Sequence, residues 1–187
     1  MIEAWLVSIG IVALAEIGDK TQLLTLVLAA RYRKPWPIVA GIFVATLLNH
    51  GIAGAVGAWL TKAVGPDAMR WVLGVSFIAM AGWMLVPDKL DEDDAAPRRV
   101  GGVFASTAVL FFLVEIGDKT QIATVALAAR FDSLLAVVMG TTIGMLLANA
   151  PVAFFGEALA KRLPVRTVHV VAAVVFAALG IGVLLLG

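Results

Sequence analysis

The sequence contains no cysteine, which excludes disulfide bonds, thiolate zinc sites and thiol nucleophiles. It is also poor in charge, because only 14% of its 187 residues are Asp, Glu, Lys or Arg, against about 25% in a typical globular domain. The net charge is +1 and no long basic stretch is present, so the chain lacks the electrostatic footprint of a nucleic-acid-binding protein.

Apolar residues take the place of the missing charge and make up 61% of the chain. A soluble core of this size cannot hide that much apolar surface, whereas a lipid bilayer can accommodate it. A helix that crosses the ~30 Å hydrocarbon core needs about 20 apolar residues. We therefore predict an all-α polytopic membrane protein with six transmembrane helices. The predicted spans are residues 4–30, 35–61, 70–87, 101–129, 134–160 and 167–187.

The basic residues of the connections predict how the chain is oriented. One set of connections holds Lys62, Arg70 and Arg130. The other set holds Arg31, Arg33, Lys34, Lys89, Arg98, Arg99, Lys161, Arg162 and Arg166. Because loops rich in Lys and Arg stay in the cytoplasm, we expect the second set to be cytoplasmic and both termini to be external.

The chain contains an internal repeat. Residues 16–22 read Glu-Ile-Gly-Asp-Lys-Thr-Gln, and residues 115–121 repeat the same seven residues at an offset of 99. Each half holds three predicted spans, and an odd number makes the second half enter the membrane from the opposite side. The sequence thus predicts two inverted three-helix repeats, 1–87 and 101–187, which is the architecture of many secondary transporters. Residues 88–100 form an acidic cytoplasmic linker, which we interpret as a solvated hinge.

Each repeat carries two carboxylates near the middle of a predicted span. Glu16 and Asp19 are three residues apart, so a continuous helix would present them on nearly the same face, as it would Glu115 and Asp118. An acidic or lysine side chain at this depth costs ~2.5–3.5 kcal/mol on insertion scales. These groups are therefore expected to face the interior of the bundle.

Two interpretations of this charged cluster are open. In a purely structural one, Glu16 pairs with Lys20 and Glu115 pairs with Lys119, each four residues along a helix. That arrangement accounts for the lysines but leaves two further carboxylates unexplained. Ionisable residues inside a membrane are functional by default, and we therefore favour a ligand site.

Carboxylate oxygens favour hard cations such as Mg²⁺, Ca²⁺ and Mn²⁺, whereas Zn²⁺ and copper favour imidazole or sulfur. We predict that Glu16, Asp19, Glu115 and Asp118 bind a divalent cation, which is the transported substrate and not a cofactor; no cofactor is expected. The residues expected to support this site are Lys20, Thr21, Gln22, Lys119, Thr120, Gln121, His50 and Asn149.

Several polar and glycine positions have more than one interpretation. His50 and Asn149 lie at equivalent positions of the two halves and either line the pathway and relay protons or make interhelical hydrogen bonds. Gly18 and Gly117 lie inside the motifs and either ease helix packing or let the helix unwind. His169, at the start of the last span, is expected to have no role.

The doubled Glu-x-Gly-Asp-Lys-Thr motif, in two three-span halves joined by an acidic loop, resembles the Gdt-type family of Mn²⁺/Ca²⁺ cation:proton exchangers. This family was once listed as uncharacterised, and it includes human transmembrane protein 165 and bacterial manganese exporters. The resemblance covers nearly the whole chain. It implies a transporter that exchanges Mn²⁺ or Ca²⁺ for protons, with the motif carboxylates as its metal site.

Taken together, these patterns predict a secondary transporter of the cell (inner) membrane that exports a divalent cation, with Mn²⁺ as the first candidate, in exchange for protons. A Ca²⁺/H⁺ antiporter is the alternative within transport. A passive divalent-cation channel and an intramembrane enzyme are alternatives of other classes, although the Gly-x-Gly-Asp signature of membrane aspartyl proteases is not matched. The expected partners are the metal ion, protons and the lipid bilayer, and a homodimer is compatible with the sequence.

The orientation can be tested with single cysteines, because the chain has none of its own. We expect Ala95→Cys, in the linker, to react with a membrane-impermeant thiol reagent only after the cytoplasmic face is opened. Ala68→Cys, near the predicted external set, should react in intact cells. Labelling of Ala95→Cys in intact cells would contradict the predicted orientation.

Overall fold

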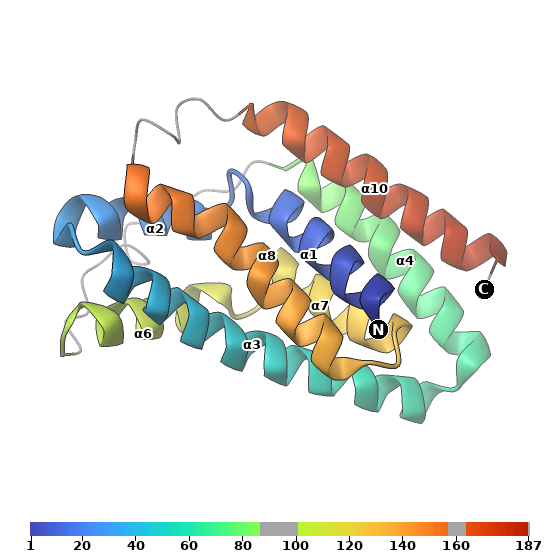
Figure 1. Cartoon of the computed structure of the whole chain (residues 1–187). Helices are drawn as coiled ribbons and strands as arrows, with labels where there is room; N and C mark the ends of the chain where they lie inside the picture. The colour runs from blue at the N-terminus through green and yellow to red at the C-terminus, as the bar shows by residue number, and fades with distance from the viewer. Residues whose placement is uncertain (87–100, 157–163, 187) are drawn as a thin grey trace.

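The computed structural model describes residues 1–86, 101–156 and 164–186, and every regular element in these ranges is an α-helix. The elements are arranged as one bundle (Figure 1). They are α1 (Ile2–Glu16), α2 (Lys20–Tyr32), α3 (Pro35–Val64), α4 (Pro66–Met84), α6 (Val103–Glu115), α7 (Lys119–Arg130), α8 (Leu134–Phe155) and α10 (Val165–Leu186). The predicted all-helical class is thus confirmed for the described residues, and the predicted linker at 88–100 lies outside them.

Within the described residues, three helices are long and apolar enough to cross a membrane: Pro35–Val64, Leu134–Phe155 and Val165–Leu185. They fall on three of the predicted spans. Pro35 and Pro66 occupy the first turns of α3 and α4, where a missing N–H and a fixed φ angle favour helix initiation. The remaining three predicted spans stay predictions.

The first and fourth predicted spans, 4–30 and 101–129, are not continuous helices, because each contains a break. The chain unwinds after Glu16 and resumes at Lys20, and it unwinds again after Glu115 and resumes at Lys119. Gly18 and Gly117 lie within these breaks with φ angles of 84° and 78°, a left-handed conformation that favours glycine. The two glycines therefore let the helix unwind.

The offset of 99 that relates the two sequence repeats also relates the helices. α1 corresponds to α6, α2 to α7, α3 to α8, and α4 to α10, and the breaks fall at corresponding positions. Packing follows the same relation, because α1 packs on α8 and α6 packs on α3. The broken helix of each half therefore packs against the long helix of the other half.

Glycines at corresponding positions allow this packing. A Cβ added at Gly140 in α8 would lie 2.7 Å from the carbonyl oxygen of Trp5 in α1. A Cβ added at Gly41 in α3 would lie 2.9 Å from the carbonyl oxygen of Phe104 in α6. Backbone atoms cannot move aside as a flexible side chain can, so both interfaces require a residue without a side chain.

We expect Gly140→Ala to lower the free energy of unfolding by about 1–3 kcal/mol, the usual effect of overpacking. Gly51→Ala in α3 is the matched control, because an added Cβ there meets no atom within 4 Å. Unfolding of both variants in detergent micelles checks the prediction. Equal stability of the two variants would contradict the proposed close approach of α1 and α8.

Candidate metal centre

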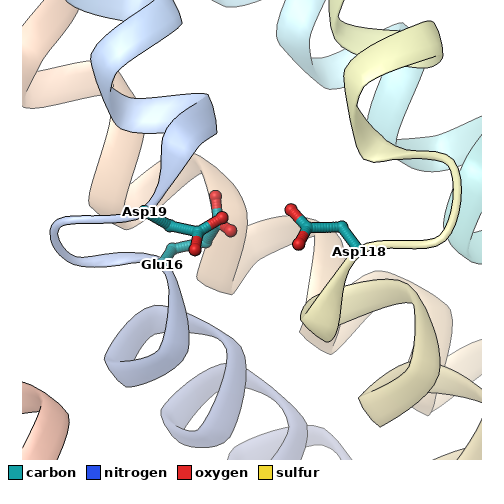
Figure 2. A group of neighbouring side chains, drawn as sticks. All are labelled: Glu16, Asp19 and Asp118. Carbon is teal, nitrogen blue, oxygen red and sulfur yellow. The ribbon is translucent and has the colours of Figure 1, made fainter. Parts of the chain in front are cut away.

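The two helix breaks bring carboxylates of both halves together. Glu16 ends α1, Asp19 precedes α2, and Asp118 precedes α7. One carboxylate oxygen from each of the three lies within 4.8 Å of the others. Figure 2 shows the Asp118 carboxylate facing those of Glu16 and Asp19 from the opposite break. We call these three residues the carboxylate cluster; each is at most 2% exposed.

The spacing of the cluster suits a single cation. Oxygens that bind Ca²⁺ lie 2.3–2.6 Å from the ion, so two ligands of one ion are at most about 5 Å apart. The N-terminal ends of α2 and α7 begin at the two aspartates, and the partial positive charge of a helix N-terminus favours carboxylates there. The cluster is thus compact enough to act as one site.

The fourth motif carboxylate, Glu115, lies outside the three-residue cluster. Its Oε1 atom accepts a hydrogen bond from Thr120 Oγ1 at 2.5 Å and lies 3.3 Å from His50 Nε2. Glu115 and His50 are both fully or almost fully buried. The structure therefore brings three of the four predicted ligands together and places the fourth beside a histidine.

Glu16 is held in a similar way by residues at the corresponding positions. Thr21 Oγ1 and Asn149 Nδ2 both donate to Glu16 Oε2, the latter at 3.1 Å. Thr25, which sequence reasoning did not single out, donates to Asn149 Oδ1 at 2.7 Å and so orients the amide. The identity of Thr25 and Thr124 at the offset of 99 is the sequence signal that could have drawn attention to it.

In each motif carboxylate, one oxygen takes part in a hydrogen bond or an ion pair. The other oxygen has no hydrogen-bond partner within the described part of the chain. The four unpartnered buried atoms are Glu16 Oε1, Asp19 Oδ2, Glu115 Oε2 and Asp118 Oδ2. A buried polar atom without a partner is costly, and charged oxygens are the costliest. Such atoms fit the ligands of a hard divalent cation.

The two motif lysines reach across to the opposite half. Lys119 Nζ lies 3.2 Å from Asp19 Oδ1, and Lys20 Nζ lies 3.7 Å from Asp118 Oδ1. The purely structural interpretation, which we did not favour, instead paired each lysine with the glutamate of its own motif on a continuous helix. Because the helix is interrupted between Glu16 and Lys20, the four-residue spacing no longer sets the contacts.

The motif glutamines stabilise the breaks. Gln22 Oε1 accepts from the Gly18 backbone N–H at 3.0 Å, and Gln121 Oε1 accepts from the Gly117 N–H at 2.7 Å. Gln22 also donates to the Ala148 carbonyl oxygen of α8 at 3.0 Å. These contacts replace hydrogen bonds that the unwound backbone has given up.

Comparisons with known proteins identify the family of the chain. A family model described as "Divalent cation/proton antiporter GDT1" matches residues 4–92 and 103–187, one segment in each half. The chain belongs to the GDT1 family. The resemblance drawn from the doubled motif is therefore confirmed, and the family is one of transporters.

Relatives of the GDT1 family in several organisms are similar to this chain. A provisionally named manganese exporter of Vibrio cholerae is 53% identical over 91% of this chain and 84% of its own length. The GDT1-like protein sll0615 of Synechocystis is 25% identical over 94% of both chains. A GDT1-like protein 3 of Oryza sativa is 25% identical over 94% of this chain and 71% of its own. No solved structure matches the chain.

Removing one partner of a buried ion pair typically destabilises a protein by about 3–5 kcal/mol. We expect Lys119→Met to lower the free energy of unfolding by about that amount, because Lys119 is fully buried. Lys20→Met should have a smaller effect, because the Lys20 side chain is 22% exposed and its pair is longer. Unfolding in detergent measures both. Equal effects of the two substitutions would contradict the cross-half pairing.

Proposed function

We propose that this GDT1-family protein exports a divalent cation, with Mn²⁺ as the first candidate, in exchange for protons. The observation that carries the proposal is the carboxylate cluster, in which three buried carboxylates from both halves each keep one unpartnered oxygen. Membership of a divalent cation/proton antiporter family supports the reaction class. The name of the relative from Vibrio cholerae supports Mn²⁺ as the ion.

Ca²⁺ is the second candidate. The three ligands of the cluster are all carboxylates, and such oxygens suit Ca²⁺ as well as Mn²⁺. The imidazole of His50 contacts Glu115 and is not one of the three ligands of the carboxylate cluster. A Ca²⁺/H⁺ antiporter would use the same residues.

We call the four motif carboxylates and the two motif lysines together the polar centre, and its charge supports coupling to protons. Four motif carboxylates and two lysines carry a formal charge of −2 when all six are ionised. One divalent cation would neutralise this charge, and so would two protons. Like charges buried together cannot all stay ionised without compensation. Departure of the metal would therefore be linked to uptake of protons by the carboxylates, and binding of the metal would release them.

The broken helices support a membrane arrangement of six spans. In this arrangement α1 with α2, and α6 with α7, each form one discontinuous span, and α3, α4, α8 and α10 form the other four. Discontinuous helices whose ends meet near the midplane are how many inverted-repeat transporters build an ion site. The cytoplasmic linker and the external termini follow from the distribution of Lys and Arg.

Flux through the purified protein in liposomes tests the exchange. We expect an imposed proton gradient to drive Mn²⁺ or Ca²⁺ against its own gradient, and addition of either metal to move protons the other way. An entrapped metal indicator and an entrapped pH dye report the two fluxes. Metal flux that ignores the pH gradient, with no counter-movement of protons, would favour a channel and rule out exchange.

Ligands from both halves should be required together. We expect Glu16→Gln and Asp118→Asn each to lower Mn²⁺ flux to the level of protein-free liposomes, while the folded protein remains in the membrane. Glu3→Gln, at an exposed position of α1, is the control and should transport normally. Normal flux through either cluster variant would contradict a site shared by the two halves.

A further inference from the structure

The helix pair formed by α4 and α10 is placed asymmetrically in an otherwise repeated structure. α10 packs on α1 and α4 packs on α7, whereas the corresponding pairs, α4 with α6 and α10 with α2, make no comparable contact among the described residues. Figure 1 shows α4 and α10 side by side along α1, away from the end of the molecule where α2 and α6 lie. The pair thus breaks the correspondence that the other helices keep.

The two helix breaks are also unequal, because α10 covers only the first of them. Val165 at the start of α10 covers the first break so closely that a Cβ at Gly18 would lie 2.2 Å from its Cγ1 atom. His169 Nε2 lies 2.7 Å from the carbonyl oxygen of Ile17, within hydrogen-bond distance. At the second break an added Cβ at Gly117 would meet no atom of the described residues within 4 Å, and Ile116 is 55% exposed. Within the described part of the chain, the first break is therefore covered and the second is open.

The short helices are also packed unequally. A cavity of about 590 Å³ separates the C-terminal parts of α2 and α8 and is lined by Leu26, Ala30, Ala153 and Phe154 among others. In the corresponding pair, α7 and α3, a Cβ added at Gly57 would lie 2.2 Å from the Val125 carbonyl oxygen. The α2–α8 pair therefore leaves a hollow at positions where the corresponding α7–α3 pair is in close contact.

We propose that the α4–α10 pair moves between two docking positions, on α1 and α7 in the state described here and on α2 and α6 in an alternate state. The contact between His169 and the Ile17 carbonyl oxygen holds the present state. This inference rests on the proposed transport function, for which the movement would provide alternating access to the carboxylate cluster. His169, which the sequence analysis expected to have no role, becomes a positioning residue.

The internal repeat supplies the physical reason. When two halves have corresponding contacts, exchanging their conformations gives a second state built from similar contacts and hence of similar energy. In that state Arg70, at the position corresponding to His169, would lie at the Ile116 carbonyl oxygen. The cavity would then form between α3 and α7, and the space between α2 and α8 would close.

Mirror pairs of cysteines in the full chain test the movement. Met69→Cys with Ala129→Cys reports the present state, because both residues line one cavity between α4 and α7. Val168→Cys with Ala30→Cys lies at the corresponding positions of α10 and α2 and reports the alternate state. A short, reducible bifunctional thiol reagent is applied to each variant in liposomes, and Mn²⁺ flux is measured before cross-linking, after it and after reduction.

We expect both pairs to cross-link in transporting protein, either cross-link to stop flux, and reduction to restore it. Undiminished flux through fully cross-linked protein would overturn the proposal, as would a mirror pair that never cross-links in a variant that transports. Cross-linking is read on gels and is independent of flux. Both pairs cross-linking in a protein that moves no cation would therefore disprove the transport function and leave the movement standing.

Substitution of His169 provides a second test, which measures cross-linking ratios and does not depend on whether a cross-link stops transport. His169→Leu removes the donor to Ile17, and His169→Gln retains an N–H donor. One hydrogen bond is typically worth ~1 kcal/mol, so we expect His169→Leu to raise the ratio of mirror-pair to present-pair cross-linking about fivefold. His169→Gln should leave the ratio near that of the unsubstituted chain. An unchanged ratio in His169→Leu would overturn the assigned role of His169.

Discussion

The structure depends on the burial of four carboxylates and of Lys119 in a chain that is otherwise strongly apolar. Ionised groups without compensation would prevent such a bundle from forming. Compensation comes from the opposite half, because Lys119 faces Asp19 and Lys20 faces Asp118. Each motif lysine therefore compensates an aspartate of the other half, so the ion pairs are complete only when the two halves are packed together.

The helix breaks make this pairing geometrically available. An unbroken helix would keep each lysine on the side of its own glutamate, four residues away. The left-handed glycines interrupt the helix after Glu16 and Glu115, so the aspartates instead become the first residues of new helices. The two halves differ at one pair of corresponding positions. Asn149 donates a hydrogen bond to Glu16, whereas His50 contacts Glu115. The carboxylate cluster is consequently asymmetric, although it is built from identical motifs.

Sequence reasoning reached the repeat, the helical class and the residues of the polar centre, because identical heptads and midspan charges are visible without coordinates. It left the helix breaks at Gly18 and Gly117 as one of two interpretations. Periodicity says nothing of a break that depends on the φ angle of one glycine, and therefore the contacts of Lys20 and Lys119 could not be predicted. The role of His169 was missed for a related reason, because its partner is a backbone carbonyl oxygen that only the break exposes.

We propose that one cation site is built from both halves, and direct binding tests this most simply. Mn²⁺ binding to the detergent-purified chain can be counted by electron paramagnetic resonance of the free ion. We expect one Mn²⁺ per chain, with binding lost in Asp19→Asn and equally in Asp118→Asn. Two independent ions per chain, with each substitution removing just one of them, would contradict it.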